Sequence, residues 1–135
     1  MRHPDWPEKM AAHIEQARNT PFSWGSHDCC LFAADVVLAM TGTDFGAVFR
    51  GHYTTRAGAF RALKKYGATT IPDTATALLG APITPTLAQR GDVVYAQTLR
   101  GPAMGICAGA TACFAAPEGL THLPLSECTM AWRVE

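Results

Sequence analysis

Apolar residues near the start of the chain recur every three or four positions, which predicts an amphipathic helix. The residues on this face are Trp6, Met10, Ile14 and Ala17. Asp5, with Glu8 three positions later, predicts a capping box at the helix start. The segment 19–21, Asn-Thr-Pro, predicts its end, because the residue before a proline disfavours helical geometry.

A nearly uninterrupted apolar run over residues 29–40 predicts a second helix. A helix that is apolar on almost all sides is expected at the centre of the fold. The turn-rich segment 22–28 precedes it, and Gly42 is expected to end it. Either Asp28 or Ser26 can serve as N-cap, which places Cys29 in the first helical turn.

Two further helices are predicted over residues 54–66 and 73–79, ended by Gly67 and Gly80. After a proline-containing connector the pattern changes to short β-like runs separated by Gly, Pro or acidic residues. These runs cover residues 93–97, 103–107, 112–115, 120–125 and 129–134. The order predicts an α+β fold in which N-terminal helices pack on a C-terminal antiparallel β-meander.

The chain of 135 residues has no repeat and no low-complexity linker. We therefore expect a single domain over residues 1–135, with 1–80 mainly helical and 88–134 mainly β. Eleven Lys and Arg balance eleven Asp and Glu, which excludes a nucleic-acid partner held by bulk charge. A basic face in the middle of the chain suggests at most an interface with an acidic partner; it comprises Arg50, Arg56, Arg61, Lys64 and Lys65.

The longest apolar stretch, residues 31–40, contains Asp35 and is far shorter than the roughly 20 residues that span a bilayer. We therefore expect no membrane span. The first six residues lack the apolar run of a secretory signal. The protein is accordingly expected not to be secreted by a signal peptide.

Five cysteines are present, an odd number without a C-x-x-C pair: Cys29, Cys30, Cys107, Cys113 and Cys128. This pattern indicates neither a disulfide framework nor a zinc or iron–sulfur site, so we expect reduced thiols, no metal and no cofactor. Cys29 differs from the others, because a helix N-terminus favours negative charge and lowers a thiol pKa. It is therefore either a nucleophile or a buried cysteine that begins an apolar helix.

The order of motifs resembles the NlpC-type cell-wall peptidases, papain-like cysteine hydrolases of peptidoglycan stem peptides. The resemblance rests on Trp24-Gly25, Asp28-Cys29, the Gly-Asp-Val-Val-Tyr segment 91–95, and the strand-like segments 104–107 and 112–116. More specifically, the chain is similar to short NlpC-like proteins encoded among the tail-tip genes of long-tailed phages. They share the W-G-x-x-D-C helix start, a Gly-x-Tyr-Thr-Thr segment (51–55) and an Ala-Trp-Arg-Val end (131–134).

The resemblance implies a degenerate active site. Cys29 matches the nucleophile, but the position of the family's histidine base is Ala103, and the residue that orients the base falls at about Ala115. A cysteine hydrolase needs an imidazole near the sulfur to form the thiolate and to protonate the leaving amine. The resemblance therefore implies that Cys29 is a vestigial nucleophile, with His122 and His27 the first histidines to test as substitute bases.

Three functions follow from the sequence as hypotheses. The first is a catalytically inactive structural component of a phage tail tip or baseplate. It would be made in the host cytoplasm, carried in the virion, and bound to hub and distal tail proteins and to peptidoglycan. The second is an active phage-borne peptidoglycan cysteine peptidase. The third is a cytoplasmic thiol enzyme or a metal-binding module, with Cys29, Cys30, His27, Cys107 and Cys113 as candidate ligands.

Overall fold

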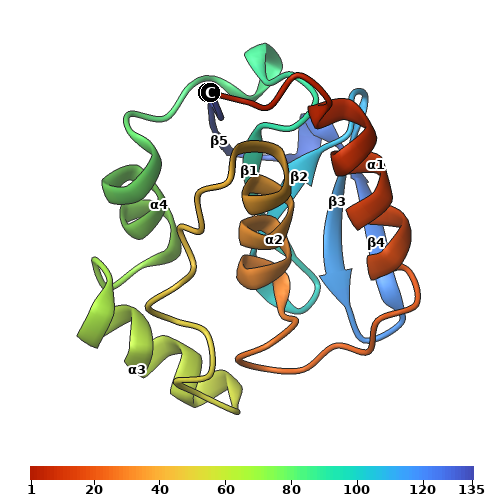
Figure 1. The fold of residues 1–135 in the computed structure, drawn as a ribbon. Helices are drawn as coiled ribbons and strands as arrows, with labels where there is room; N and C mark the ends of the chain where they lie inside the picture. The colour runs from red at the N-terminus through yellow and green to blue at the C-terminus, as the bar shows by residue number, and fades with distance from the viewer.

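Four helices precede a five-stranded antiparallel sheet in the computed structural model, which describes residues 1–135 (Figure 1). The helices are α1 (Trp6–Ala17), α2 (Cys29–Thr41), α3 (Arg56–Tyr66) and α4 (Ile71–Leu79). The strands are β1 (Val93–Thr98), β2 (Gly101–Cys107), β3 (Thr111–Ala116), β4 (Gly119–Pro124) and β5 (Met130–Trp132), with short 3-10 turns at Pro85–Leu87 and Leu125–Glu127. The predicted α+β class is confirmed.

Helix α2 begins and ends as the sequence predicts. The Asp28 carboxylate accepts a hydrogen bond from the Leu31 backbone N–H at 3.0 Å, and Gly42 ends the helix in the left-handed conformation. Seven of its thirteen residues are buried. It packs on α1 on one side and across β2 and β3 on the other, so it is the central helix (Figure 1).

Helix α1 begins directly after Asp5, as predicted, but its capping box and the start of α4 differ from the sequence predictions. The capping box at α1 is wrong: Asp5 has φ −97° and ψ 23°, not the extended geometry of an N-cap, and its side chain caps no amide. The Asp5 carboxylate instead lies 3.9 Å from the Lys9 ammonium. Helix α4 starts two residues earlier than predicted, because the Thr70 hydroxyl caps it and Pro72 fits its first turn.

The sheet has the strand order β4-β3-β2-β1-β5, with every neighbouring pair antiparallel. Strands β1 to β4 form the predicted meander. The meander does not continue into β5, which returns to the far side of β1 and sets Trp132 opposite Val93. Between β2 and β3 the ladder is short, pairing Ile106 with Cys113 and Cys107 with Ala112.

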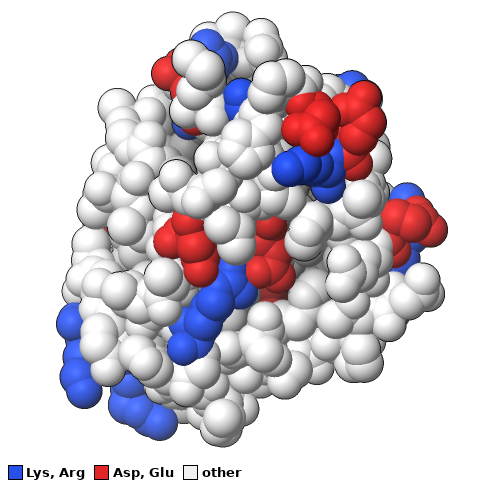
Figure 2. Space-filling view, in the orientation of Figure 1, with Lys and Arg blue, Asp and Glu red and all other residues white.

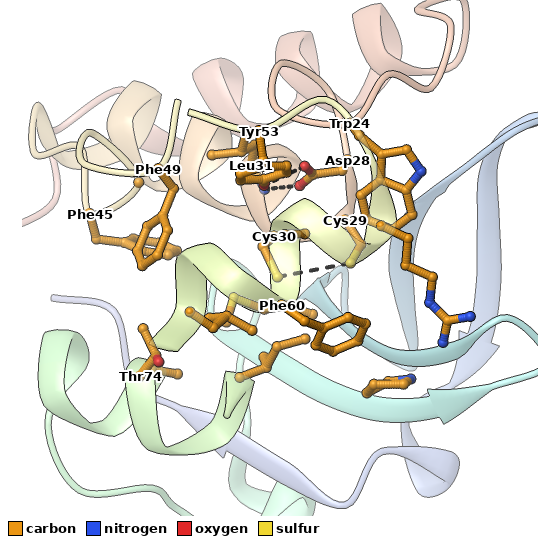
Figure 3. A pocket seen from close by; sticks show the side chains of 18 of the residues that line it. Trp24, Asp28, Cys29, Cys30, Leu31, Phe45, Phe49, Tyr53, Phe60 and Thr74 are labelled. Carbon is orange, nitrogen blue, oxygen red and sulfur yellow. Dashed lines mark hydrogen bonds between the residues drawn. The ribbon is translucent and has the colours of Figure 1, made fainter. Parts of the chain in front are cut away.

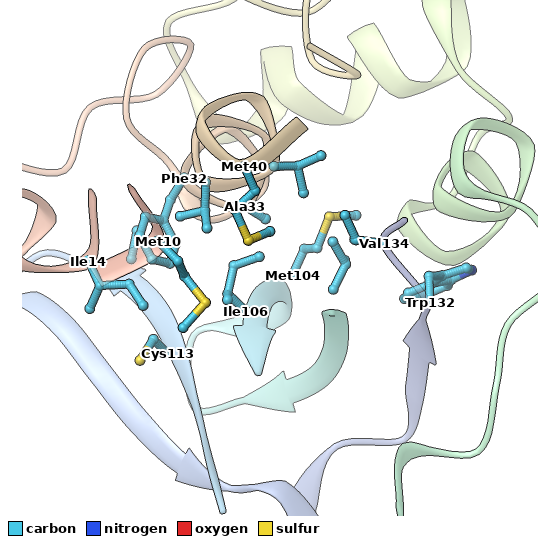
Figure 4. Close-up of a cluster of buried hydrophobic side chains, with 14 of the residues drawn as sticks. Met10, Ile14, Phe32, Ala33, Met40, Met104, Ile106, Cys113, Trp132 and Val134 are labelled. Carbon is cyan, nitrogen blue, oxygen red and sulfur yellow. The ribbon is translucent and has the colours of Figure 1, made fainter. Parts of the chain in front are cut away.

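The two faces of the sheet are covered differently. One face packs under α1, α2 and α4, and this layer contains most of the core, including Phe32 and Met40 from α2 and Met104, Ile106 and Trp132 from the sheet (Figure 4). The other face carries smaller side chains and is covered by the segments around the two 3-10 turns. Its buried residues include Val94, Ala96, Ala103, Ala112 and Phe114. Both faces are therefore sealed, and α2 lies on the more heavily covered one.

The two ends of the chain meet at a buried carboxylate just before β1. The Arg2 guanidinium lies 3.0 Å from the Asp92 carboxylate and also donates to the Val134 carbonyl at 2.8 Å. The Val134 backbone N–H donates to the same carboxylate. None of the helices combines the length and apolar character needed to cross a membrane.

Candidate functional site

Cys29 is the first residue of α2, as predicted, and a tight turn fixes where the helix begins. Gly25 in this turn has φ +87°, and a side chain there would collide with the Tyr53 carbonyl oxygen, 1.9 Å from the position of a Cβ. The turn is closed by an isolated bridge between Ser23 and His27. The segment after α2 therefore packs directly on the turn before it.

The Asp28 carboxylate is buried and organises this end of the helix. One oxygen accepts from the Leu31 N–H; the other accepts from the Gly25 N–H at 3.0 Å and from the Tyr53 hydroxyl at 2.5 Å (Figure 3). All three donors are neutral. Burial first, and then the negative charge of Asp28, raise the pKa of the Tyr53 hydroxyl far above its ordinary value, so it stays protonated and donates.

Two thiols lie next to this carboxylate. The sulfurs of Cys29 and Cys30 are 3.9 Å apart (Figure 3). The hydrogen bond between the two thiols lowers the pKa of Cys29 despite its burial, and the backbone amide of Met104 adds to this effect. The same pairing raises the pKa of Cys30 well above its ordinary value. Cys29 is therefore the thiol that ionises first.

Both thiols open into an apolar cavity between α2, the loop after it, α3, α4 and the start of β2. Fourteen of its twenty lining residues are hydrophobic, among them Phe45, Phe49 and Phe60 (Figure 3). Its free volume is about 80 Å³, enough for several waters or a small group, given that one water needs about 10–15 Å³. Asp28 is its one acidic residue, and no histidine lines it.

Position 103, where the resemblance implies a base, directly precedes the residue whose backbone amide acts on the Cys29 sulfur. The Met104 amide that acts on this sulfur belongs to the peptide that joins Ala103 to Met104. Cys29 also packs against the buried cluster that contains Ala103. Ala103 has only a methyl side chain and cannot act as a base.

The second implied position, Ala115, points to the opposite face of the sheet from Ala103. Ala115 belongs to the cluster under α1 and α2, whereas Ala103 belongs to the cluster on the other side. Because side chains alternate along a strand, Ala116 rather than Ala115 shares the face of Ala103. Both positions carry a methyl group, so neither can orient an imidazole.

The two candidate substitute bases lie elsewhere. The ring of His27 packs edge-on against Phe32 and lines a separate hollow with His13 and Asp35. Its Nε2 is buried without a hydrogen-bond partner, and burial lowers its pKa. His122 on β4 has its Nδ1 3.5 Å from the Cys113 sulfur. The structure brings neither histidine into the cavity that holds Cys29.

Neither the contact of Tyr53 with Asp28 nor the pairing of the Cys29 and Cys30 thiols was predicted from the sequence. Tyr53 is 25 residues from Asp28 along the chain, and the sole signal that marked it was the Gly-x-Tyr-Thr-Thr segment. The proposed metal ligands are also not assembled: the structure contains no group of three or more His, Cys, Asp or Glu residues placed to hold a metal ion.

Residues 1–134 match the model of a family described as "Domain of unknown function (DUF6950)". The match covers both the helical part and the sheet. No curated protein matches the chain.

Proposed function

We propose that this chain, which belongs to the DUF6950 family, is a structural component of a long-tailed phage tail tip or baseplate, built on a papain-like NlpC fold that has lost peptidase activity. One observation carries the proposal. Cys29 is the first residue of the central helix, and the residue that the resemblance assigns to the base, Ala103, has only a methyl side chain. The cavity around the thiol contains no histidine.

The motifs shared with the phage proteins support the fold in this proposal, because each makes a contact that holds the site or the sheet together. Tyr53 binds Asp28, and Thr55 caps α3 through the Gly58 N–H. At the chain end, the Trp132 ring N–H donates to the Thr76 hydroxyl at 3.1 Å. A resemblance carried by such contacts is what a common fold with a decayed active site predicts.

A structural role needs a surface for neighbouring proteins, and α3 supplies one. It carries four basic residues and no acidic ones: Arg56, Arg61, Lys64 and Lys65. In Figure 2 basic side chains gather over this helix, at the lower left, whereas acidic and basic side chains are mixed over the rest of the visible face. We propose an acidic surface of a hub or distal tail protein as its partner.

An active cell-wall peptidase is the second candidate, and the lowered pKa of Cys29 favours it. A thiolate alone supplies the attacking group but no proton for the departing amine. This candidate therefore needs a base that moves into the cavity when substrate binds.

Particle composition tests the tail-tip proposal. In particles purified from the phage or prophage that encodes this chain, mass spectrometry should detect the protein in a fixed ratio to the tail proteins. Gold-labelled antibodies should bind the tail tip, and deletion of the coding sequence should give defective tails. Absence of the protein from infectious particles with intact tails would contradict the proposal.

A further inference from the structure

We propose that the paired thiols of Cys29 and Cys30 form a binding site for a single soft, low-coordinate cation, with monovalent copper as the defining example. The inference goes beyond the structural role proposed above and does not depend on it. It rests on the placement of the two sulfurs, on the amide beside them and on the lining of the cavity into which they open.

The spacing of the sulfurs fits two bonds to one ion. Metal–thiolate bonds are about 2.3 Å long, so two sulfurs on one ion lie at most about 4.6 Å apart. The observed distance between the Cys29 and Cys30 sulfurs is 3.9 Å. An ion held by two thiolates alone takes a nearly linear arrangement, which needs the full separation of about 4.6 Å, so each sulfur has to move outward by roughly 0.35 Å. A small rotation of the two side chains gives this separation, and the pair can then bind one ion.

The surroundings favour the negative charge that such a site carries. Both sulfurs belong to the first turn of α2, where free N–H groups stabilise anions. The backbone amide of Met104, on β2, acts on both sulfurs from the other side. The helix N-terminus and this strand amide both favour the thiolate form of the pair.

The lining of the cavity selects for low coordination number. Zinc takes four ligands, and the cavity offers few beyond the two sulfurs. The nearest carboxylate, that of Asp28, already accepts three hydrogen bonds. Apart from Arg56, Arg100, Tyr53 and Thr74, the other side chains around the cavity offer almost no polar groups. Soft thiolates in such a setting prefer monovalent copper.

The binding step involves no change in oxidation state. The Cys29 thiolate and the Cys30 thiol each form one bond to the ion, and the Cys30 proton is released to solvent. Where Cys29 is protonated, its proton is released as well. Binding should therefore strengthen as pH rises.

A transfer titration tests the proposal. Monovalent copper is supplied as its coloured complex with bathocuproine disulfonate, under reducing conditions, and transfer to the folded protein is read as loss of colour. Wild type should remove one equivalent. Cys29→Ser/Cys30→Ser should remove none. The matched control Cys107→Ser/Cys128→Ser, which deletes two buried thiols on the other face of the sheet, should still remove one.

Several outcomes would overturn the proposal: no transfer to wild type, equal transfer to the Cys29→Ser/Cys30→Ser variant, or loss of transfer in the control. Circular dichroism of each variant verifies folding. As an independent readout, copper should protect Cys29 and Cys30 of wild type from iodoacetamide, as mapped by mass spectrometry. Protection confined to other cysteines, or one equivalent of zinc held by the same pair, would also contradict it.

Discussion

Two buried carboxylates, Asp28 and Asp92, are each 1% exposed and have different partners. Asp92 accepts hydrogen bonds from the Gln89 and Val134 backbone N–H groups and forms an ion pair with Arg2. Asp28 accepts from two backbone N–H groups and one hydroxyl, all neutral. One carboxylate is neutralised by a cation, and the other is not.

The two carboxylates therefore have different effects: Asp92 joins distant parts of the chain, whereas Asp28 changes the ionisation of nearby side chains. The ion pair at Asp92 holds the N-terminus, the start of β1 and the C-terminus together, and its charge is compensated locally. The charge of Asp28 is uncompensated and acts on its neighbours, where it opposes ionisation of Cys29 and Tyr53. Asp28 thus both caps α2 and sets the electrostatics around the thiols.

The largest effect is expected from removal of the compensated carboxylate. Asp92→Ala leaves two buried backbone N–H groups without their acceptor and the largely buried Arg2 guanidinium without its counter-charge, although Arg2 still donates to the Val134 and Arg90 carbonyls. It should lower the free energy of unfolding by about 3–5 kcal/mol. Asp28→Ala removes a helix cap and two further bonds to neutral donors, and should cost about 2–3 kcal/mol.

Urea denaturation measures both losses, and Glu127→Ala, which removes an exposed carboxylate between β4 and β5, is the matched control that should change stability by less than about 0.5 kcal/mol. A loss at Asp28 equal to or greater than that at Asp92 would mean that compensation by Arg2 does not distinguish the two sites.

A smaller effect is expected from the hydroxyl that reaches Asp28 from the loop after α2. Tyr53→Phe deletes one hydrogen bond to a buried carboxylate oxygen and should cost about 1–2 kcal/mol. Tyr66→Phe is the control, because that side chain is exposed. Equal thermal melting shifts in the two variants would show that the Tyr53 contact contributes nothing to stability.

The smallest expected effect is a change in reactivity with pH. Hydrogen bonding lowers the pKa of Cys29 and raises the pKa of Cys30. Alkylation of Cys29 by iodoacetamide should therefore reach half its maximal rate at a lower pH than alkylation of an ordinary thiol, and alkylation of Cys30 should reach half its maximal rate at a higher pH. In Cys30→Ala the Cys29 midpoint should move to higher pH. Peptide mass spectrometry resolves the alkylation rates of the two thiols and gives both midpoints. An unchanged Cys29 midpoint in Cys30→Ala would show that the Cys30 thiol does not lower the pKa of Cys29.

Local signals predicted most of the secondary structure. The apolar run of α2, its cap at Asp28 and its glycine at position 42 all act within a few residues, so sequence spacing identified them. The capping box at Asp5 was a false positive because side-chain identity does not fix the backbone, and Asp5 adopts a conformation unsuited to capping.

Contacts between distant parts of the chain could not be predicted in the same way. Tyr53 meets Asp28 across 25 residues, and Arg2 meets Asp92 across 90. The placement of β5 beside β1 likewise depends on how the chain returns past β4, which periodicity does not encode. Within the site, the sequence placed Cys29 at the helix start, but the thiol pair and the cavity emerge only when α2, α3 and β2 are packed together.

Hydrolysis of a fluorogenic stem-peptide substrate, compared between wild type and Cys29→Ala, tests most directly whether the site is inactive. Loss of a base and its orienting residue from a cysteine hydrolase costs on the order of 10⁴–10⁶ in turnover. With methyl groups at positions 103, 115 and 116, wild type should be indistinguishable from Cys29→Ala. Turnover by wild type that Cys29→Ala abolishes would contradict the account and identify the chain as an active peptidase.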